Sequence, residues 1–358
     1  MRLQPPGEDS MTTQAASSGT TPGTAPSRHR VAVVICTFNR AGLLEKTLSS
    51  FLLLRVPHSL QWELLVVNNG STDETESVCA SFSNWLPLRV IVEREPGLSN
   101  ARNRALWSVN ADYLVYTDDD VIVDPGWLES FVDAAKRWPS ASAFGGPVEP
   151  DFPIEPAPDL LAAFPVLATG FCGLDHHRPE GPLPTTLEVY GANMAYRVDA
   201  VAGLRFDPRL GHTPNSLRGG EETKFLADVR ARGGDVLWCP NMRVKHYVDP
   251  SRMTLEYLVS YHEGRGEALV RSEGLPPAPA ILGVPRWLWR KTIEAYGHYL
   301  LFLLTAKRVE TLKRLRRCSV LRGMLRECWT SRDRGRTPAT PRQNGRTAKA
   351  SERMTELS

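Results

Sequence analysis

The sequence of 358 residues lacks several features that mark other classes of protein. It has no run of about eighteen apolar residues, which a membrane-spanning helix needs, and residues 1–27 lack the apolar core of a secretory signal. Its six cysteines are scattered, without a C-x-x-C pair or a matching histidine spacing, so they indicate neither a zinc site nor a disulfide framework. We therefore expect reduced thiols in a cytoplasmic protein.

Two glycine-rich patterns that hold nucleotide phosphates are also missing. No G-x-G-x-x-G follows the first apolar run, and no G-x-x-x-x-G-K-[ST] occurs in the chain. If a nucleotide binds, side chains and a metal ion must hold its phosphates.

The sequence does contain a regular alternation of strand and helix patterns. Apolar runs rich in β-branched residues predict buried strands. These strands are residues 31–36, 62–67, 88–92 and 113–116. Between them, an apolar stripe over residues 44–52 predicts one helix, and Ser71 with Glu74 forms a capping box that predicts the start of another. This alternation predicts an α/β fold, with a mostly parallel sheet covered by helices on both faces.

Three polar loops follow the predicted strands, and one of them is acidic. The loops "NRAG", "NNGSTD" and "TDDD" leave strand carboxyl ends, where open α/β sheets bind ligands, so we expect them to meet in one crevice. Three adjacent carboxylates repel one another, and a simple turn would form at lower cost with Asn, Gly or Ser. The acidic loop is therefore either a surface turn or a site for something positive.

Six segments taken together resemble glycosyltransferase family 2 of the GT-A fold. They are "VVICTFNRAGLLEKTLSSF", "LLVVNNGSTDET", "PGLSNARNRAL", "YTDDDVIVDPGWL", "YGANMAYR" and "GGEETKF", between Val31 and His246. The resemblance implies a Rossmann-like GT-A domain and an inverting, metal-dependent hexosyltransferase. Its donor would be a nucleoside-diphosphate sugar, and its pathway the biosynthesis of a polysaccharide or glycoconjugate.

The acidic loop matches the family's D-x-D element at Asp118, Asp119 and Asp120. The resemblance implies that Asp120 binds a divalent cation, Mg²⁺ or Mn²⁺, and that Asp118 faces both the ribose and the cation. Asp119 is the least certain donor contact of the three. His246 stands where many members have a histidine that completes the metal shell, although a lone histidine beside apolar residues is usually structural.

The resemblance also implies a set of donor-binding residues outside the acidic loop. Thr37 and Asn39 lie at the end of the first strand, and Arg102 matches an arginine that approaches the donor diphosphate. Asn68 stands where the commoner form of the family has Asp. Its amide can contact the nucleobase, or it can simply form a turn with its neighbours, so the identity of the base stays open.

The candidate general base lies in the segment "RGGEETKF". In the family, the second acid of this pair deprotonates the acceptor hydroxyl, and here that residue is Glu222 in place of the usual Asp. Glu221 is the alternative, and two acids at a helix N-terminus are also favourable without any function.

We expect four parts along the chain. They are a disordered N-terminal extension (1–28), the GT-A catalytic domain (29–250), a C-terminal helical region (251–329) and a disordered basic tail (330–358). Prolines between Pro147 and Pro184 predict an irregular excursion, where we expect acceptor recognition.

The helical region contains an apolar stripe on a helix predicted from residue 286 to 307. The stripe consists of Trp289, Ile293, Tyr296, Leu300, Leu303 and Leu304. It packs on the catalytic domain or, alternatively, attaches the enzyme peripherally to the cytoplasmic face of a membrane that carries a lipid-linked acceptor. The charge distribution favours the second option, because the segment from Lys307 onward carries +10 and the rest about −7.

Two other functions remain open at this point. One is a metal-dependent nucleotidyltransferase or phosphohydrolase that uses the aspartates. The other is a non-catalytic carbohydrate- or membrane-binding module on a GT-A fold, which the residues Asn68 and Glu222 would suit. We expect no nucleic-acid partner, and the sequence does not identify the sugar or the acceptor.

Overall fold

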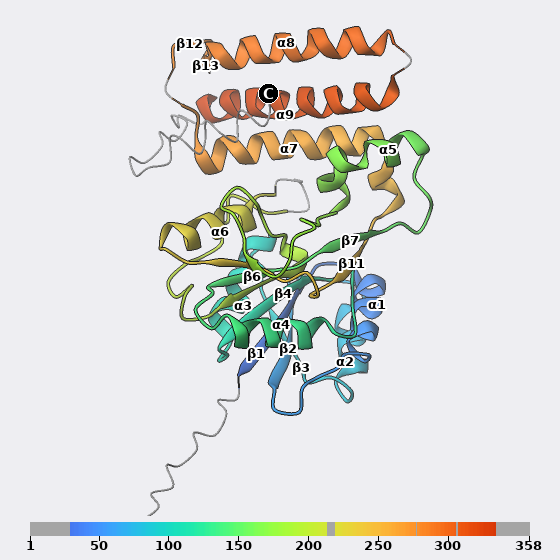
Figure 1. Cartoon of the computed structure of the whole chain (residues 1–358), viewed down its shortest axis with the longest axis vertical. Helices are drawn as coiled ribbons and strands as arrows, with labels where there is room; N and C mark the ends of the chain where they lie inside the picture. The colour runs from blue at the N-terminus through green and yellow to red at the C-terminus, as the bar shows by residue number, and fades with distance from the viewer. Residues whose placement is uncertain (1–28, 213–218, 277, 306, 334–358) are drawn as a thin grey trace, which may run out of the picture.

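The computed structural model describes residues 29–212, 219–276, 278–305 and 307–333 (Figure 1). The extension expected at residues 1–28 and all but the first four residues of the tail expected at 330–358 lie outside this described part. In the described part, the last helix continues to Asp333.

Residues 29–250, which the sequence analysis expects to be catalytic and which we call the catalytic half, are built on one mixed sheet with eight strands in the described part of the chain. In spatial order the strands are β3 (Leu88–Val92), β2 (Gln61–Asn68), β1 (Arg30–Thr37), β4 (Tyr113–Asp118), β9 (Met194–Arg197), β6 (Ala143–Gly145), β10 (Val236–Trp238) and β8 (Gly181–Pro182). Strands β1 to β4 are mutually parallel, and β9 runs antiparallel between β4 and β6. The prediction of a mostly parallel α/β sheet is confirmed.

Strand β1 shows why the sheet is covered on both faces. Its side chains alternate, so that Val33 and Ile35 enter one apolar cluster while Val34 enters the other. The helices on the first face are α1 (Ala41–Phe51), α2 (Thr75–Phe82) and α4 (Trp127–Arg137), and those on the second are α3 (Leu98–Ser108) and α6 (Glu221–Ala231). Both faces of β1 are therefore buried, which explains its continuous apolar sequence.

The start of α2 differs from the sequence prediction. The hydroxyl of Ser71 accepts a hydrogen bond from the backbone of Asn39 at 3.0 Å, so it does not cap the helix. Asp73 accepts instead from the backbone nitrogen of Thr75 at 3.2 Å. The predicted capping box is wrong, because the Ser71 hydroxyl binds the backbone of Asn39, which is distant in the sequence, and not the start of the helix.

A smaller sheet lies beside the acidic loop. Its strands are β5 (Val121–Val123), β11 (Val244–Tyr247) and β7 (Val148–Asp151). Strand β5 begins directly after Asp120, and its Val121 is paired with His246 of β11. This register brings the histidine to the aspartates from more than 120 residues away along the chain.

The proline-rich excursion contains one further helix. This helix is α5 (Pro158–Leu167), and a short 3₁₀ helix follows it at Ala168–Phe171. Two further 3₁₀ helices lie outside the excursion, at Gly191–Asn193 and Pro250–Met253. The N-terminal turn of α5 has Pro158 in its first position, where the missing N–H costs nothing.

Three helices form a separate layer over one end of the catalytic half (Figure 1). They are α7 (Leu255–Glu273), α8 (Arg286–Leu303) and α9 (Arg308–Asp333), and a short hairpin of β12 (Ala280–Ile281) and β13 (Val284–Pro285) joins α7 to α8. Helix α9 lies between α7 and α8. We call these three helices the helical unit.

Glycines allow α7 and α9 to approach closely. A Cβ atom on Gly266 of α7 would collide with the carbonyl oxygen of Val320, and one on Gly323 of α9 would collide with the backbone of Glu263. The two backbones are therefore in direct contact, and this contact fixes the position of α9 on α7.

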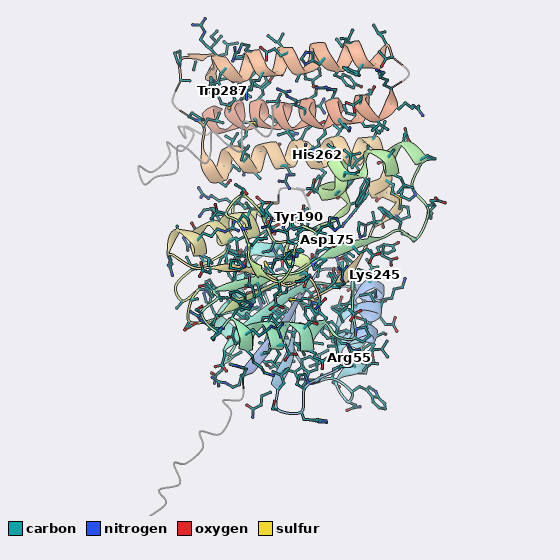
Figure 2. All side chains as sticks on the ribbon, in the orientation of Figure 1. Arg55, Asp175, Tyr190, Lys245, His262 and Trp287 are labelled. Atoms are coloured by element: carbon teal, nitrogen blue, oxygen red, sulfur yellow. The ribbon has the colours of Figure 1, made fainter. Side chains whose placement is uncertain are left out.

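The apolar stripe of α8 is divided between two environments. Trp289 and Tyr296 pack with Trp287 against α9, in the apolar core of the helical unit (Figure 2). Ile293, Leu300, Leu303 and Leu304 are exposed instead. The expectation that the stripe packs on the catalytic domain is wrong, because α9 lies between. No helix in the described residues is long and apolar enough to span a bilayer.

Candidate active site

The carboxyl ends of β1, β2 and β4 bring the three polar loops together, as their parallel order requires. Cys36 is paired with Asp118 across β1 and β4, and Thr37 with Asn68 across β1 and β2. A cavity of about 840 Å³ opens at this edge. Its wall includes all three aspartates of the acidic loop, and it continues to the helical unit.

Asp119 and Asp120 are buried and share one cation, the guanidinium of Arg40. This group lies 2.7 Å from Oδ1 of Asp119 and 2.9 Å from Oδ2 of Asp120. The hydroxyl of Thr37 donates to the other oxygen of Asp119 at 2.8 Å. Burial raises the pKa of Asp119 to about 6, although Arg40 acts against this rise. Both oxygens of Asp119 therefore have protein partners.

Asp120 lies among three positive groups. The Nε2 atom of His246 is 3.2 Å from its Oδ1, and Arg252 lies 3.9 Å from its Oδ2 on the side of Arg40. Burial alone would raise the pKa of Asp120, but the charges of His246 and Arg40 hold it below its usual value. Burial disfavours the charged form of His246, yet the Asp120 carboxylate raises its pKa to about 10.

The residues Asp118, Asp120 and His246 suit a divalent cation. One ligand atom from each lies within 4.8 Å of the others. The Nδ1 atom of His246 is 2.9 Å from the carbonyl oxygen of Tyr247, which can only accept, so Nε2 points to the aspartates without its own proton when the ring is neutral. Both carboxylate oxygens of Asp120 are buried and accept no hydrogen bond of normal geometry. Hard oxygens with one imidazole match Mg²⁺ or Mn²⁺.

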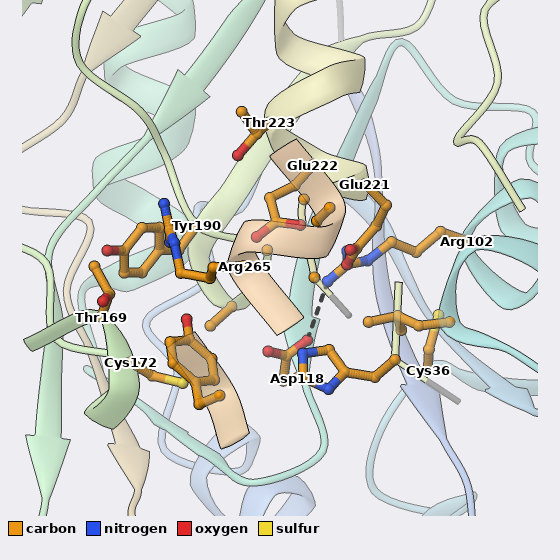
Figure 3. Close-up of a pocket in the computed structure, with 18 of the residues that line it drawn as sticks. Cys36, Arg102, Asp118, Thr169, Cys172, Tyr190, Glu221, Glu222, Thr223 and Arg265 are labelled. Atoms are coloured by element: carbon orange, nitrogen blue, oxygen red, sulfur yellow. Dashed lines mark hydrogen bonds and ion pairs between the residues drawn. The ribbon is translucent and has the colours of Figure 1, made fainter. Parts of the chain in front are cut away.

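The acid pair lies at the first turn of α6, beside a buried arginine (Figure 3). Arg102 is 2% exposed, and its guanidinium lies 2.6 Å from Glu221 and 3.4 Å from Asp118. Gly191 makes room for this group, because a Cβ atom there would collide with it. Arg102 thus joins the acid pair to the acidic loop, and its charge already has protein partners.

Glu222 differs from Glu221 in its surroundings. Burial, followed by the neighbouring Glu221 carboxylate, raises the pKa of Glu222 to about 8. Both residues line the cavity, and Oε2 of each has no hydrogen-bond partner, but only Glu221 is ion-paired with Arg102. Glu222 therefore carries a proton near neutral pH that it can exchange, whereas Glu221 is fixed by Arg102.

The structure does not bring every sequence-predicted residue to the cavity wall. Thr37 lines the cavity, but Asn68 is buried, and its side-chain oxygen accepts from the backbone of Ser71 at 2.8 Å. The side-chain oxygen of Asn39 accepts from the backbone of Thr72 at 2.7 Å. Asn68 and Asn39 shape the loops, and the neighbouring Asn69 lines the cavity instead.

Sequence reasoning missed several residues of the cavity wall. Arg40 belongs to the quoted loop "NRAG" but received no role, and Arg252 follows β11. Tyr190, Arg265 and Arg316 also line the cavity. An arginine on an amphipathic helix has the sequence signature of a solvated surface charge, so the sequence offered no signal for the last two.

Comparisons with known proteins agree with this geometry. The model of the family described as "Glycosyl transferase family 2" matches residues 32–207. The succinoglycan biosynthesis protein ExoM of Rhizobium meliloti is 28% identical over 233 residues, which is 63% of this chain and 69% of that protein. The glucosyl-dolichyl phosphate glucuronosyltransferase of Haloferax volcanii is 25% identical over 235 residues, or 64% of this chain and 73% of that protein.

Solved structures show the same fold. The mannosyltransferase PcManGT of Pyrobaculum calidifontis, in complex with GDP-Man and Mn²⁺, has a TM-score of 0.56 at 18% identity, and the match covers 85% of this chain and 88% of that one. Residues 1–349 of S. aureus TarS, in complex with UDP-GlcNAc, have a TM-score of 0.50 at 12% identity, with 86% and 92% covered.

Proposed function

The chain belongs to glycosyltransferase family 2 and has the GT-A fold, and we propose that it transfers a sugar with inversion from a nucleoside-diphosphate sugar to an acceptor hydroxyl. The observation that carries the proposal is that one cavity contains both the group of Asp118, Asp120 and His246 and the half-buried carboxyl group of Glu222. The presence of nucleotide sugars in PcManGT and TarS supports the donor class.

Asp118, Asp120 and His246 would hold the divalent cation in this proposal. When bound, the cation neutralises the negative charge that develops on the leaving diphosphate. Thr37 and Asn69 form the wall beside the acidic loop where the nucleoside would bind. Asp119 is already engaged by Thr37 and Arg40, so we assign it the role of fixing the loop.

Glu222 is the proposed general base. The acceptor oxygen forms a bond to the anomeric carbon while the bond to the diphosphate oxygen breaks, and Glu222 takes the hydroxyl proton. A base with a pKa near 8 is only partly ionised at neutral pH, but its ionised fraction is a strong proton acceptor, and this fraction grows as the pH rises. Glu221 remains the alternative base, but its ion pair with Arg102 makes it a positioning residue in this proposal.

The test compares Glu222→Gln with Glu221→Gln in full-length protein. A panel of nucleotide sugars with Mn²⁺ is screened for release of nucleoside diphosphate, and donor binding is measured by calorimetry. We expect Glu222→Gln to bind the donor normally and to lose most of the transfer. If only Glu221→Gln is inactive, the base assignment moves by one residue.

The same screen separates the two competing functions. Release of a nucleoside monophosphate or of pyrophosphate would indicate a phosphohydrolase or nucleotidyltransferase. Binding of Mn²⁺ and nucleotide with no release of any product, across the whole panel, would favour a non-catalytic module.

We further propose a lipid-linked acceptor and peripheral contact with an anionic membrane through α8. The Haloferax volcanii relative is named for a dolichyl phosphate acceptor, which supports this class. Ile293 and Leu301 of α8, and Leu304 directly after it, have exposed fractions of 69%, 60% and 88%. The exposed Arg286 and Arg290 lie at the other end of the same helix. Apolar side chains flanked by basic groups suit the interface of an anionic bilayer.

Liposome flotation tests this contact in the full chain. The variant Ile293→Asn with Leu301→Asn and Leu304→Asn should float less with anionic liposomes than the wild type does. Leu53→Asn is the control, because Leu53 is 68% exposed but lies just after α1 in the catalytic half. Equal flotation of the wild type and the triple variant would contradict the contact.

A further inference from the structure

The cavity has a second end, which the helical unit forms. Beyond the acid pair its wall includes Tyr261 and Arg265 of α7 and Arg316 of α9. Figure 2 shows Tyr190 in the catalytic half and His262 on α7 of the helical unit. In Figure 3, Arg265 lies beside Tyr190, on the other side of Glu222 from Arg102. A molecule that fills the cavity would therefore extend from Glu222 to the two arginines.

Arg265 and Arg316 line the same end of the cavity, and Arg265 lies close enough to act on Arg316. Burial, and then the charge of Arg265, lowers the pKa of Arg316. His262 responds to the same pair, because burial and then the charges of Arg316 and Arg265 lower its pKa to about 3. The histidine is neutral, and this end of the cavity is positive.

The protein compensates these two charges unequally: burial would lower the pKa of Arg265 but Tyr261 and Glu188 raise it, whereas the pKa of Arg316 is lowered. In the part of the chain that the structure describes, neither Arg265 nor Arg316 forms an ion pair with a carboxylate, and Nε of Arg316 is buried without a hydrogen-bond partner. Glu188 and Tyr261 act on Arg265 through their charge and a hydrogen bond, but no carboxylate bridges the two arginines. Arg265 and Arg316 are half-buried at one end of a cavity, and Arg316 pairs with no carboxylate in the described residues, so the arrangement suits a ligand that supplies an anion.

We infer that the acceptor is a phosphate ester, whose phosphate binds between Arg265 and Arg316 while its hydroxyl group reaches Glu222. This inference rests on the proposed glycosyl transfer and names the acceptor class for the same site. The planar guanidinium presents paired donors that match phosphate oxygens. Ala268, Leu269 and Val320 line the same end, so the ester next to the phosphate has apolar neighbours.

Two sources share this chemistry, a lipid phosphate and a phosphorylated glycan. Three soluble probes separate them, namely octyl phosphate, glucose 1-phosphate and the neutral octyl glucoside. Their binding to the full chain is measured by calorimetry with EDTA present, below the concentration at which the octyl compounds form micelles. EDTA removes divalent cations, so a phosphate probe cannot bind through a metal ion at the acidic loop, and the arginine variants show whether the other end of the cavity binds it.

The variants are Arg265→Met, Arg316→Met and the two combined, which keep an unbranched stem and most of the side-chain volume but remove charge. Each single change should weaken binding of the phosphate probe at least about tenfold, since hydrogen bonds between charged groups are lost. Binding of octyl glucoside should not change. Arg308→Met is the control, because this arginine of α9 is 83% exposed at its side chain and pairs only weakly with Asp159 at 3.7 Å.

Tighter binding of octyl phosphate than of glucose 1-phosphate supports a lipid acceptor, and the reverse supports a phosphorylated glycan. The inference is overturned if the wild type prefers no phosphate probe over octyl glucoside, or if the double variant binds phosphate as the wild type does. Binding of nucleoside diphosphate with Mn²⁺ is measured on every variant. If the wild type does not bind nucleoside diphosphate with Mn²⁺, the proposed function alone is contradicted. If the variants bind it as the wild type does, they are folded.

Discussion

Replacement of Arg40 by methionine tests how the acidic loop is neutralised before a cation binds. The guanidinium of Arg40 lies within 2.9 Å of both Asp119 and Asp120, and the two carboxylates are at most 5% exposed. Because Arg40 contacts an oxygen of Asp120, it competes with a cation for that ligand. The change to methionine keeps most of the side-chain volume and removes the competing charge.

The size of the effect follows from the burial of the pair. Removal of one partner from a buried ion pair costs about 3 to 5 kcal/mol. We take about 3 kcal/mol, since the side chain of Arg40 is 32% exposed and Asp120 keeps His246 and Arg252. For a domain of this size that lowers Tm by about 6 °C in EDTA. A cation would replace the lost charge, so Mn²⁺ should bind up to about 100-fold more tightly to the variant.

Differential scanning fluorimetry in EDTA and in a Mn²⁺ series, followed by calorimetry, measures both quantities. The control is Arg55→Met, because Arg55 pairs with Glu129 at the surface and such a pair contributes about 1 kcal/mol or less. The reasoning would be refuted if Arg40→Met bound Mn²⁺ no more tightly than the wild type. Arg40 would then belong to the cation-bound site itself and would not compete with the cation.

The other predictions concern the base, the cation and the helical unit. With a pKa of about 8, Glu222 is protonated below that pH and cannot accept a proton, so kcat/KM should rise with pH around 8, and Glu222→Gln should abolish this rise. Asp120→Asn should remove Mn²⁺-dependent binding of nucleoside diphosphate in calorimetry, and unchanged affinity would contradict its role as a ligand. Gly266→Ala should lower the stability by about 1 to 3 kcal/mol in urea unfolding, because its Cβ would collide with Val320. Gly297→Ala, on the open face of α8, is its control and should be neutral or stabilising by up to about 1 kcal/mol.

The parallel strands could be predicted because their sequences are apolar on both faces. The run from residue 31 to 36 is buried almost completely in β1, and the other three predicted strands also form, each within a few residues of its expected ends. Such burial leaves a continuous apolar pattern that local sequence records directly. By contrast, β9 is only four residues long, and its place between β4 and β6 depends on pairing with distant strands.

The candidate site was predictable where motif residues lie at strand ends, and less so where long-range contacts decide. The family resemblance placed Asp118, Asp120 and His246 in one group, and the structure brings their ligand atoms together. It did not indicate that the oxygen of Asn68 would bind the backbone of Ser71, because the turn and the base contact use the same residue types. Nor could it pair Arg102 with Glu221, which lies 119 residues away.

The position of Arg102 between Asp118 and Glu221 has a thermodynamic consequence. One buried cation touches both the acidic loop and the acid pair, so a change in the charge at Asp118 alters the electrostatic field at Glu222. Binding equilibria that are coupled in this way obey reciprocity. Whatever factor donor binding imposes on the proton affinity of Glu222, protonation of Glu222 must impose the same factor on donor affinity. The donor dissociation constant should therefore vary with pH even though no donor atom needs to contact Glu222.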